Sequence, residues 1–405
     1  MKIVNQQIIK ETNLKRIYTT IGNEPGISRA QLAKETELSR ATVSSLVDEL
    51  IRMRFVVDGG ASDINSIGRR PNMLFVNDAE TFIGVVDWTG EGIRCVIIGA
   101  GCTIVKESFS TFDLQNWSID EICNQIDQNI ISEIKGDNIL LGLCIVVPAM
   151  IDPVSKQIIS TVINIEENNT IVSELKKKFK DIPVAFLNDT ACLAYAEKIF
   201  SNIRESNFVY VNIEEGVGAT LFMNGEFLRG SNGMATQFGH FSIDRNGPKC
   251  RCGNRGCFEL MVGENALGHR VEQLAKDKFP ESVLAHIPSK EIKFNTVRQA
   301  VNLKDECAIT AVSMVAEDLA FGLNNLISLY NPELIVLGGR GAQLGDYFMS
   351  EIKKNMLSNG FTRLVNNVSL RYAKQNENAK VKGAAKIYLD KFLVITENPT
   401  GDLFI

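Results

Sequence analysis

Apolar positions repeat with a helical period in the first part of the chain. The spacing i, i+3, i+4, i+7 of one helix face is found at Leu14, Ile17, Tyr18 and Ile21. A second, short helix is predicted after Ser28, which makes an S-x-x-Q capping box with Gln31. Ser39 then caps a third helix, whose apolar face carries Val43, Leu46, Val47 and Leu50. This order is typical of a helix-turn-helix, and short strands at residues 55–57 and 73–76 predict a wing.

The pattern changes to that of an α/β protein after residue 81. Apolar or alternating runs at residues 82–88, 93–98 and 103–109 predict three antiparallel strands. A capping box at Ser118 and Glu121 begins an amphipathic helix. Apolar runs predict further strands at residues 139–147, 184–187, 208–213, 219–223 and 334–337. A helix is predicted at residues 190–200, directly after the second of these strands.

Charge is distributed unevenly along the chain. The 405 residues carry a formal net charge of −5. Residues 1–76 hold 11 basic and 8 acidic side chains, a net of +3, so the remainder carries −8. We therefore expect any contact with nucleic acid to be confined to the first module. The longest apolar run, residues 139–151, contains Gly142 and Pro148 and is shorter than the roughly 20 residues of a spanning helix. With no signal-peptide pattern at the N-terminus, we expect a soluble, cytoplasmic protein without a membrane partner.

Three of the nine cysteines crowd into one short stretch close to a histidine. His240, Cys250, Cys252 and Cys257 offer three thiolates and one imidazole, a set that satisfies tetrahedral Zn²⁺ and leaves no open position. The sequence thus predicts a structural zinc site, the alternative being buried free thiols beside an unrelated histidine.

Around these cysteines the sequence resembles a known family. The stretch GHFSIDRNGPKCRCGNRGCFE, residues 239–259, resembles the zinc signature of the ROK family of bacterial sugar kinases and sugar-responsive repressors. The resemblance runs from about residue 13 to about residue 389, and includes LND at 187–189, NGEFLRG at 224–230 and LGG at 337–339. It implies a two-lobed, actin-like (ribonuclease H-like) ROK domain with a sugar cleft between the lobes. Only the repressor branch carries a winged helix-turn-helix.

These observations predict an order of domains along the chain. Residues 1–76 form the winged helix-turn-helix and residues 77–81 a linker. The first α/β lobe spans residues 82–190. The second lobe, with the zinc site, spans 191–395, and its last helix returns to the first lobe. Residues 396–405 form a tail.

The resemblance also implies a carbohydrate site. Asn188 and Asp189 match the pair that holds the sugar in family kinases, where the aspartate is the base, so Asp189 is a vestigial base candidate. His240 would both ligate zinc and border the sugar, and Glu259 matches a second sugar-binding acid. Gln237 departs from the family's glutamate and follows Ala235-Thr236, where Ala-Gly is usual. The alternative is that these groups only cap strand ends.

Two loops separate a kinase from a repressor. The family kinases open with D-x-G-G-T, whereas residues 87–91 here read DWTGE. The second loop, usually G-x-G-[IV]-G, reads EEGVG at residues 214–218. We therefore expect Glu91, Glu214 and Glu215 to stand where ATP oxygens would lie, each unscreened repulsion costing about 4 kcal/mol. No catalytic residue is assigned.

The first module offers candidate DNA contacts. The exposed start of the third helix enters the major groove in this fold. The candidates at or near this end of the helix are Arg29, Ser39, Arg40, Thr42, Ser44 and Ser45. Arg69 and Arg70 are candidates on the wing. Solvated surface charge is the alternative for each of them.

The sequence thus predicts a sugar-responsive regulator, acting as a repressor, that binds a palindromic double-stranded DNA operator as a homodimer or homotetramer. One rival is an ATP-dependent sugar kinase with an appended DNA-binding module. Another is a zinc-stabilised scaffold with an empty cleft.

Overall fold

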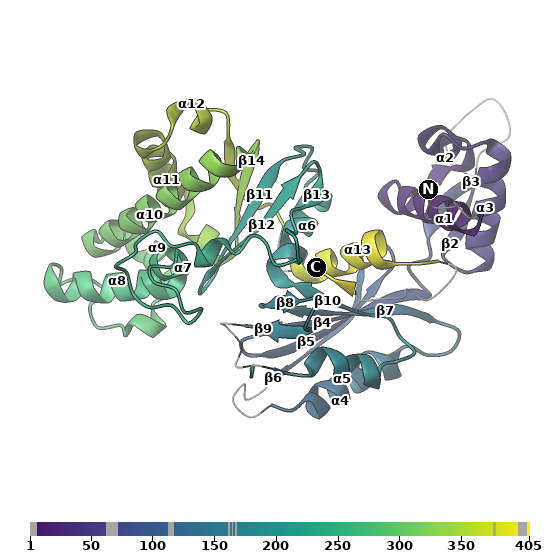
Figure 1. The fold of residues 1–405 in the computed structure, drawn as a ribbon, viewed down its shortest axis with the longest axis horizontal. Coiled ribbons are helices and arrows are strands. Elements are labelled where there is room, and N and C mark those ends of the chain that lie inside the picture. The colour runs from purple at the N-terminus through teal and green to yellow at the C-terminus, as the bar shows by residue number, and fades with distance from the viewer. Residues whose placement is uncertain are drawn as a thin grey trace. The chain divides into compact units, whose positions relative to one another are not determined.

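The computed structural model describes residues 6–61, 72–111, 117–160, 163, 165–166, 168–375, 378–395 and 403–405 (Figure 1). The chain divides into two compact units. Unit 1 comprises residues 1–196 and 377–405, and unit 2 comprises residues 197–376. Within the described residues, no helix is both long enough and apolar enough to cross a membrane.

The N-terminal part of unit 1 is a winged helix-turn-helix. It contains helices α1 Gln6–Asn23, α2 Arg29–Thr36 and α3 Arg40–Arg52, and strands β1 Ile27–Ser28, β2 Val56–Ala61 and β3 Asn72–Val76. The strands pair in the antiparallel order β1-β3-β2. Ser28 and Gln31 cap α2 reciprocally, and Glu37 turns the chain toward α3 with φ 54°. The predicted apolar faces form the core and are fully buried at Leu14, Ile17, Ile21, Val43, Val47 and Leu50.

The rest of unit 1 is a six-stranded sheet with helices on both faces. Its order is β16-β10-β7-β4-β5-β6, from strands β4 Thr81–Thr89, β5 Gly92–Gly99, β6 Ile104–Thr111, β7 Ile139–Val147, β10 Val184–Asn188 and β16 Leu403–Phe404. The pairs β4–β7, β7–β10 and β10–β16 are parallel, and β5 pairs antiparallel with both β4 and β6.

Helices pack on both faces of this sheet. Helices α4 Ile119–Asn129 and α5 Ile171–Lys178 share a core with Phe82, Val86, Leu143 and Ile145. Helix α13 Ala379–Ile387 packs on β4, β5 and β7. Tyr388, directly after α13, lies against Gly142 of β7 and donates a hydrogen bond to the carbonyl of Leu141 at 2.6 Å. Figure 1 shows α13 across the sheet from α4 and α5. Helix α6 Asp189–Phe200 packs against α13, and strands β8 Met150–Asp152 and β9 Gln157–Ile159 form a separate hairpin.

Unit 2 is built on a five-stranded sheet in the order β13-β12-β11-β14-β15. Its strands are β11 Phe208–Ile213, β12 Val217–Met223, β13 Glu226–Phe227, β14 Leu334–Gly338 and β15 Ser369–Tyr372. Its helices are α7 Glu259–Val262, α8 Glu264–Asp277, α9 Phe294–Asn302, α10 Glu306–Tyr330, α11 Gly345–Asn359 and α12 Thr362–Val365. The central helix α10 and its neighbours α8, α9 and α11 bury the main apolar cluster against the sheet.

The predicted strands are found with small shifts at their ends, but the domain limits differ in three respects. Helix α6 belongs to unit 1 as far as Ala196, so the boundary falls after residue 196 and not after residue 190. Residues 77–81 are not a free linker, because Asn77 and Thr81 side chains both donate to the carbonyl of Arg54 at 2.9 and 3.1 Å. The tail supplies strand β16 beside β10, a pairing too short to show in the pattern.

Candidate functional site

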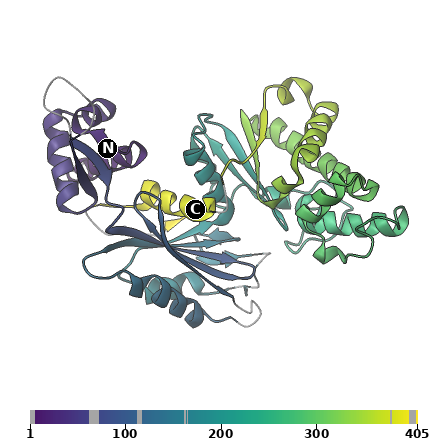
Figure 2. The same cartoon turned by 180° about the vertical axis from the view of Figure 1, so that it is seen from behind.

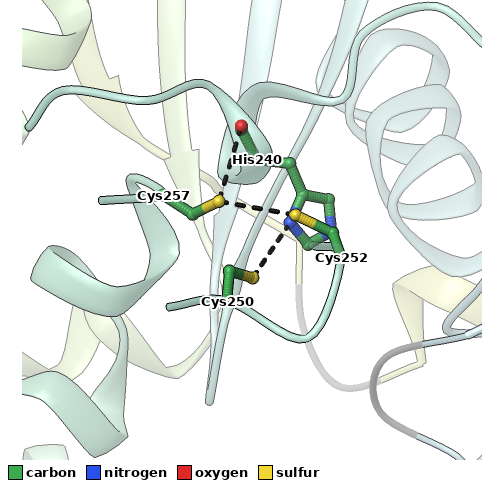
Figure 3. Close-up of side chains that lie close together, drawn as sticks. All are labelled: His240, Cys250, Cys252 and Cys257. Atoms are coloured by element: carbon green, nitrogen blue, oxygen red, sulfur yellow. Dashed lines mark hydrogen bonds between the residues drawn. The ribbon is translucent and has the colours of Figure 1, made fainter. Parts of the chain in front are cut away.

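The histidine and the three cysteines come together in unit 2. His240 ends the short 3₁₀ helix η2 Phe238–His240, and the cysteines lie on the loop that follows. All four ligand atoms lie within 4.8 Å of one another. His240 Nδ1 lies 3.7 Å from Cys250 Sγ, and Cys252 Sγ lies 3.5 Å from Cys257 Sγ (Figure 3). This Cys₃His donor set fits a tetrahedral ion of the zinc type.

Glycines allow the loop to close around this cluster. Gly256 has φ +60°, and a Cβ there would lie 1.8 Å from the carbonyl oxygen of Asp244. Its amide donates to Pro248 at 2.9 Å, while its carbonyl accepts from Ile243 at 2.9 Å. Only glycine fits such a backbone approach, so the cysteine spacing is held by the main chain.

Glu259 lies at the edge of the same cluster. Its Oε1 is 3.2 Å from Cys250 Sγ and 3.4 Å from His240 Nδ1. A Cβ placed on Gly216, in the β11–β12 turn, would meet its other oxygen at 2.8 Å. The structure therefore brings His240 and Glu259 together. Gln237 is exposed immediately before η2, and Thr236 beside it has φ +71°.

The Asn188 and Asp189 pair lies in unit 1, where β10 ends and α6 begins. Asn188 Oδ1 accepts from the amide of Ala191 at 3.0 Å, and its Nδ2 donates to the carbonyl of Ala149 at 3.0 Å. Asp189 Oδ1 accepts from the amide of Thr190 at 2.6 Å. Burial raises the pKa of Asp189, and the Lys380 ammonium acts against this. Asn188 therefore caps the start of α6.

Lys380 is a site residue that sequence reasoning missed. It stands in α13, and its Nζ pairs with Asp87 on β4 at 2.8 Å. Asp87 is nearly inaccessible, with 5% of its side chain exposed. Burial opposes the charge on Lys380, but the carboxylates of Asp87 and Asp189 together raise its pKa. Helix α13 carries three lysines, and nothing in the sequence sets Lys380 apart from Lys382 and Lys386.

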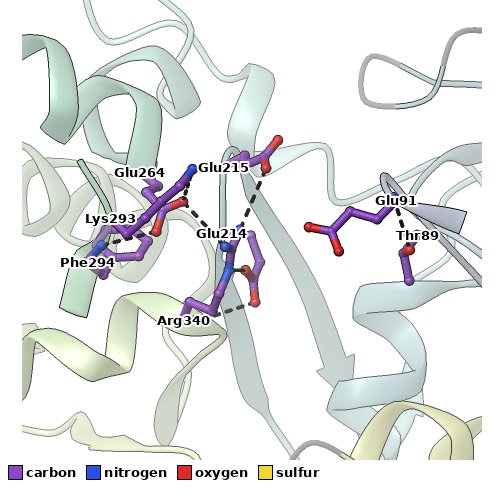
Figure 4. A network of polar contacts seen from close by, with 8 residues as sticks. All are labelled: Thr89, Glu91, Glu214, Glu215, Glu264, Lys293, Phe294 and Arg340. Atoms are coloured by element: carbon purple, nitrogen blue, oxygen red, sulfur yellow. Dashed lines mark hydrogen bonds and ion pairs between the residues drawn. The ribbon is translucent and has the colours of Figure 1, made fainter. Parts of the chain in front are cut away.

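The second acidic loop is not the unscreened set of carboxylates that we expected. Arg340, directly after the LGG turn, donates through Nε to Glu214, and its amide donates to the same carboxylate at 3.0 Å (Figure 4). Its guanidinium also lies 3.8 Å from Glu215 and 3.4 Å from the buried Glu264. The repulsion argument is therefore wrong for Glu214, because an internal cation already neutralises it.

Lys293 completes the network in unit 2. Its Nζ lies 3.3 Å from Glu264, whose other oxygen accepts from the amide of Phe294 at 3.1 Å. Two cations and three acids thus fill this loop region of unit 2. In unit 1, Glu91 is exposed in the β4–β5 turn, and its amide donates to Thr89 Oγ1 at 3.2 Å.

The candidate DNA-binding residues have different roles in the structure. Ser39 Oγ accepts from the Thr42 amide at 3.1 Å, so it caps α3, and its hydroxyl also contacts that of Thr42. Arg29 pairs with Asp48 at 2.7 Å and donates to the carbonyl of Ser44 at 3.1 Å. Arg40 and Ser45 are exposed and Ser44 is half-buried. Arg69 and Arg70 lie outside the described residues.

Comparisons with known proteins agree with this arrangement. The model of the ROK family matches residues 83–391, and a winged helix-turn-helix DNA-binding model matches residues 10–57. The chain belongs to the ROK family. It is 28% identical over 396 residues to a xylose repressor of Bacillus subtilis, covering 97% of this chain and 99% of that protein. It is 26% identical over 350 residues to NagC of Escherichia coli, a DNA-binding transcriptional dual regulator, covering 84% of this chain and 82% of that protein.

Solved structures share the fold. A ROK family transcriptional regulator, a homologue of the Escherichia coli MLC protein, superposes with a TM-score of 0.80 at 23% identity, covering 94% of this chain and 97% of that one. A ROK family glucokinase from Streptomyces griseus gives a TM-score of 0.63 at 20% identity, covering 76% of this chain and 98% of that one. The predicted fold class, a winged helix-turn-helix followed by an actin-like ROK domain, is confirmed.

Proposed function

We propose that the protein is a carbohydrate-responsive transcriptional regulator that represses its targets. The observation that carries this proposal is the winged helix-turn-helix joined to a ROK body, with Arg40 exposed at the start of α3. The xylose and N-acetylglucosamine repressors among its relatives support the same reading.

The effector in this proposal is a mono- or disaccharide. Its hydroxyls would be met by Asn188, Asp189, Gln237, His240 and Glu259. Carboxylate and amide groups suit this task because each accepts hydrogen bonds from sugar hydroxyls. A structural Zn²⁺ on His240, Cys250, Cys252 and Cys257 would supply no chemistry to the sugar. It would hold the loop on which His240 and Glu259 meet.

The protein is proposed to bind carbohydrate without phosphorylating it. Arg340 pairs with Glu214 of the second loop, Lys293 pairs with the adjoining Glu264, and Lys380 pairs with Asp87. A kinase would need both regions open to nucleotide and metal. Incubating the protein with MgATP and a hexose and pentose panel should produce no ADP above a protein-free blank. Sugar-dependent ADP that disappears in Asp189→Asn would favour the kinase.

DNA selection tests the regulatory function. Duplexes enriched from a random pool at physiological salt should share a palindrome, because the protein is proposed to bind as a homodimer or homotetramer. The proposed location of the protein is the cytoplasm. A thermal-shift panel of free and phosphorylated sugars, followed by titration of the DNA complex, should identify the effector. If the purified protein bound no DNA sequence selectively, the proposed regulatory function would be refuted.

Two arginines of α3 provide a matched pair for that assay. Arg40 begins the helix, and Arg52 ends it with 76% of its side chain exposed. Because base edges are read by the start of a recognition helix, Arg40→Ala should weaken selective binding by about 1–3 kcal/mol. Arg52→Ala should change it little. Equal losses in the two variants would indicate a general electrostatic effect.

A further inference from the structure

Three helices of unit 1 meet at one ion pair, Lys386 with Asp390. Asp390, in the π-helical turn η5 Tyr388–Phe392 that follows α13, accepts from Lys386 Nζ at 2.7 Å and from Tyr195 Oη at 2.8 Å. Lys386 comes from the last turn of α13, and Tyr195 comes from α6. The same ammonium donates to Asn23 Oδ1, at the end of α1, at 2.9 Å. We call Asn23, Tyr195, Lys386 and Asp390 the polar junction.

Within the polar junction Lys386 and Asp390 form a largely buried ion pair, whereas Asn23 at the end of α1 is exposed. Lys386 is 7% exposed, and the side chain of Asp390 is 12% exposed. Beside it, Lys15 on α1 donates to the carbonyl of Leu393 at 2.9 Å, and Glu11 accepts from the amide of Ile395 at 2.6 Å. A buried ammonium is stable only where its partners are in place. The contacts between α1 and the C-terminal segment are therefore tied to one position of α13.

The other ends of α6 and α13 reach the proposed carbohydrate site. Asp189 is the first residue of α6, and Lys380, in the first turn of α13, pairs with Asp87 at 2.8 Å. Between the two ends the helices touch through their backbones. A Cβ on Gly383 of α13 would lie 1.9 Å from the carbonyl oxygen of Cys192 on α6. Contact this close allows α6 and α13 to move together but not to slide independently.

The geometry points to α6 and α13 as the elements that carry the carbohydrate signal to the DNA-binding module, with Lys386, Asp390 and Tyr195 as positioning residues at the polar junction. This inference rests on the proposed function, whose ligand-binding Asp189 begins α6. Carbohydrate at Asp189 would compete for the charges of Asp87 and Lys380 and displace the first turns of both helices. The displacement would reach Asn23 through Lys386. Figure 2 shows the C-terminal helix lying on the sheet of unit 1.

A static role for the polar junction makes a different prediction. If Lys386 only fastens α1 to the body, its loss changes stability or operator affinity by the same factor with and without carbohydrate. If it transmits the signal, its loss reduces the ratio of the two affinities. That ratio measures the coupling between the sites and does not depend on the affinity of either one.

The experiment compares operator dissociation constants in the full-length protein, using the duplex selected above, without sugar and with saturating D-xylose or N-acetyl-D-glucosamine. Where one of them changes wild-type operator affinity by about tenfold, Lys386→Met and Asp390→Asn should reduce the change to less than about twofold. Both should keep the carbohydrate-induced rise in melting temperature. Tyr195→Phe, which removes one hydrogen bond, should reduce the change partially and covers the case in which the charge variants do not fold. Lys382→Met, in the same helix, should respond as the wild type does. A full response in Lys386→Met and Tyr195→Phe would overturn the inference.

A second arm needs no effector. Lys380→Met breaks the Asp87 pair at the carbohydrate end and should shift operator affinity several-fold in the otherwise unchanged protein. In the Lys386→Met background the same substitution should have no effect. An equal shift in both backgrounds would overturn the inference and leave the proposed function standing. Failure of the wild type to bind any selected duplex would refute the proposed function itself.

Discussion

Single residues in strained or buried settings control the local geometry of unit 2. Thr236 is β-branched yet has φ +71°, beside Gln237 and four residues before His240. L-residues avoid this region because the Cβ approaches the backbone, and β-branched residues suffer most. Glu197 is a fully buried carboxylate that accepts from Arg371 Nη1 at 2.7 Å and from the amides of Lys374 and Gln375 at 3.1 Å. It holds the segment that leaves β15 against helix α6.

Replacing Thr236 with glycine should stabilise the protein. Relief of the left-handed strain outweighs the extra freedom of glycine in the unfolded chain, so we expect a gain of about 1 kcal/mol in the free energy of unfolding. Thr236→Ala keeps the Cβ and should gain less. Urea unfolding of the three proteins provides the measurement, and a lower midpoint for Thr236→Gly would show that the strain is balanced by contacts of the threonine.

Replacing Glu197 with alanine should be strongly destabilising. It leaves Arg371 and two amides without their acceptor, and loss of one partner of a buried ion pair costs about 3 kcal/mol. Glu351→Ala serves as the control, because its partner Lys354 is 69% exposed and such surface pairs contribute little. Thermal unfolding followed by circular dichroism distinguishes the two variants. Similar midpoints for both would contradict the buried-pair assignment.

At the scale of elements, the contact between α6 and α13 depends on one glycine. Because the Cβ of an alanine at position 383 would overlap the Cys192 carbonyl, Gly383→Ala must separate the two helices. We expect a loss of about 2 kcal/mol in the free energy of unfolding. Gly90→Ala is the matched control, since a Cβ there meets nothing within 4 Å. Denaturant unfolding tests the pair, and an unchanged midpoint for Gly383→Ala would show that α13 can shift freely.

At the scale of the whole molecule, the proposed metal links the cysteine loop to the stability of unit 2. Metal analysis of protein purified without chelator should find one zinc ion per chain, because the Cys₃His set fills a tetrahedral shell. Removing it with a strong chelator should lower the melting temperature, because binding free energy is lost from the folded state. Cys252→Ser should abolish that dependence. A melting temperature indifferent to chelator in the wild type would indicate four unbridged side chains.

Local patterns along the chain were enough to predict the features that depend on near neighbours. The predicted features include the capping residues Ser28 and Ser118, the buried strands β7 and β10, and the clustering of Cys250, Cys252 and Cys257. Each of them depends on neighbours close along the chain. The partners of charged side chains, in contrast, became known only from the folded chain. Lys380 with Asp87, Arg340 with Glu214 and Lys386 with Asn23 join residues more than a hundred positions apart. Such pairs follow from how helices and sheets pack, and no periodicity or spacing in the chain records them.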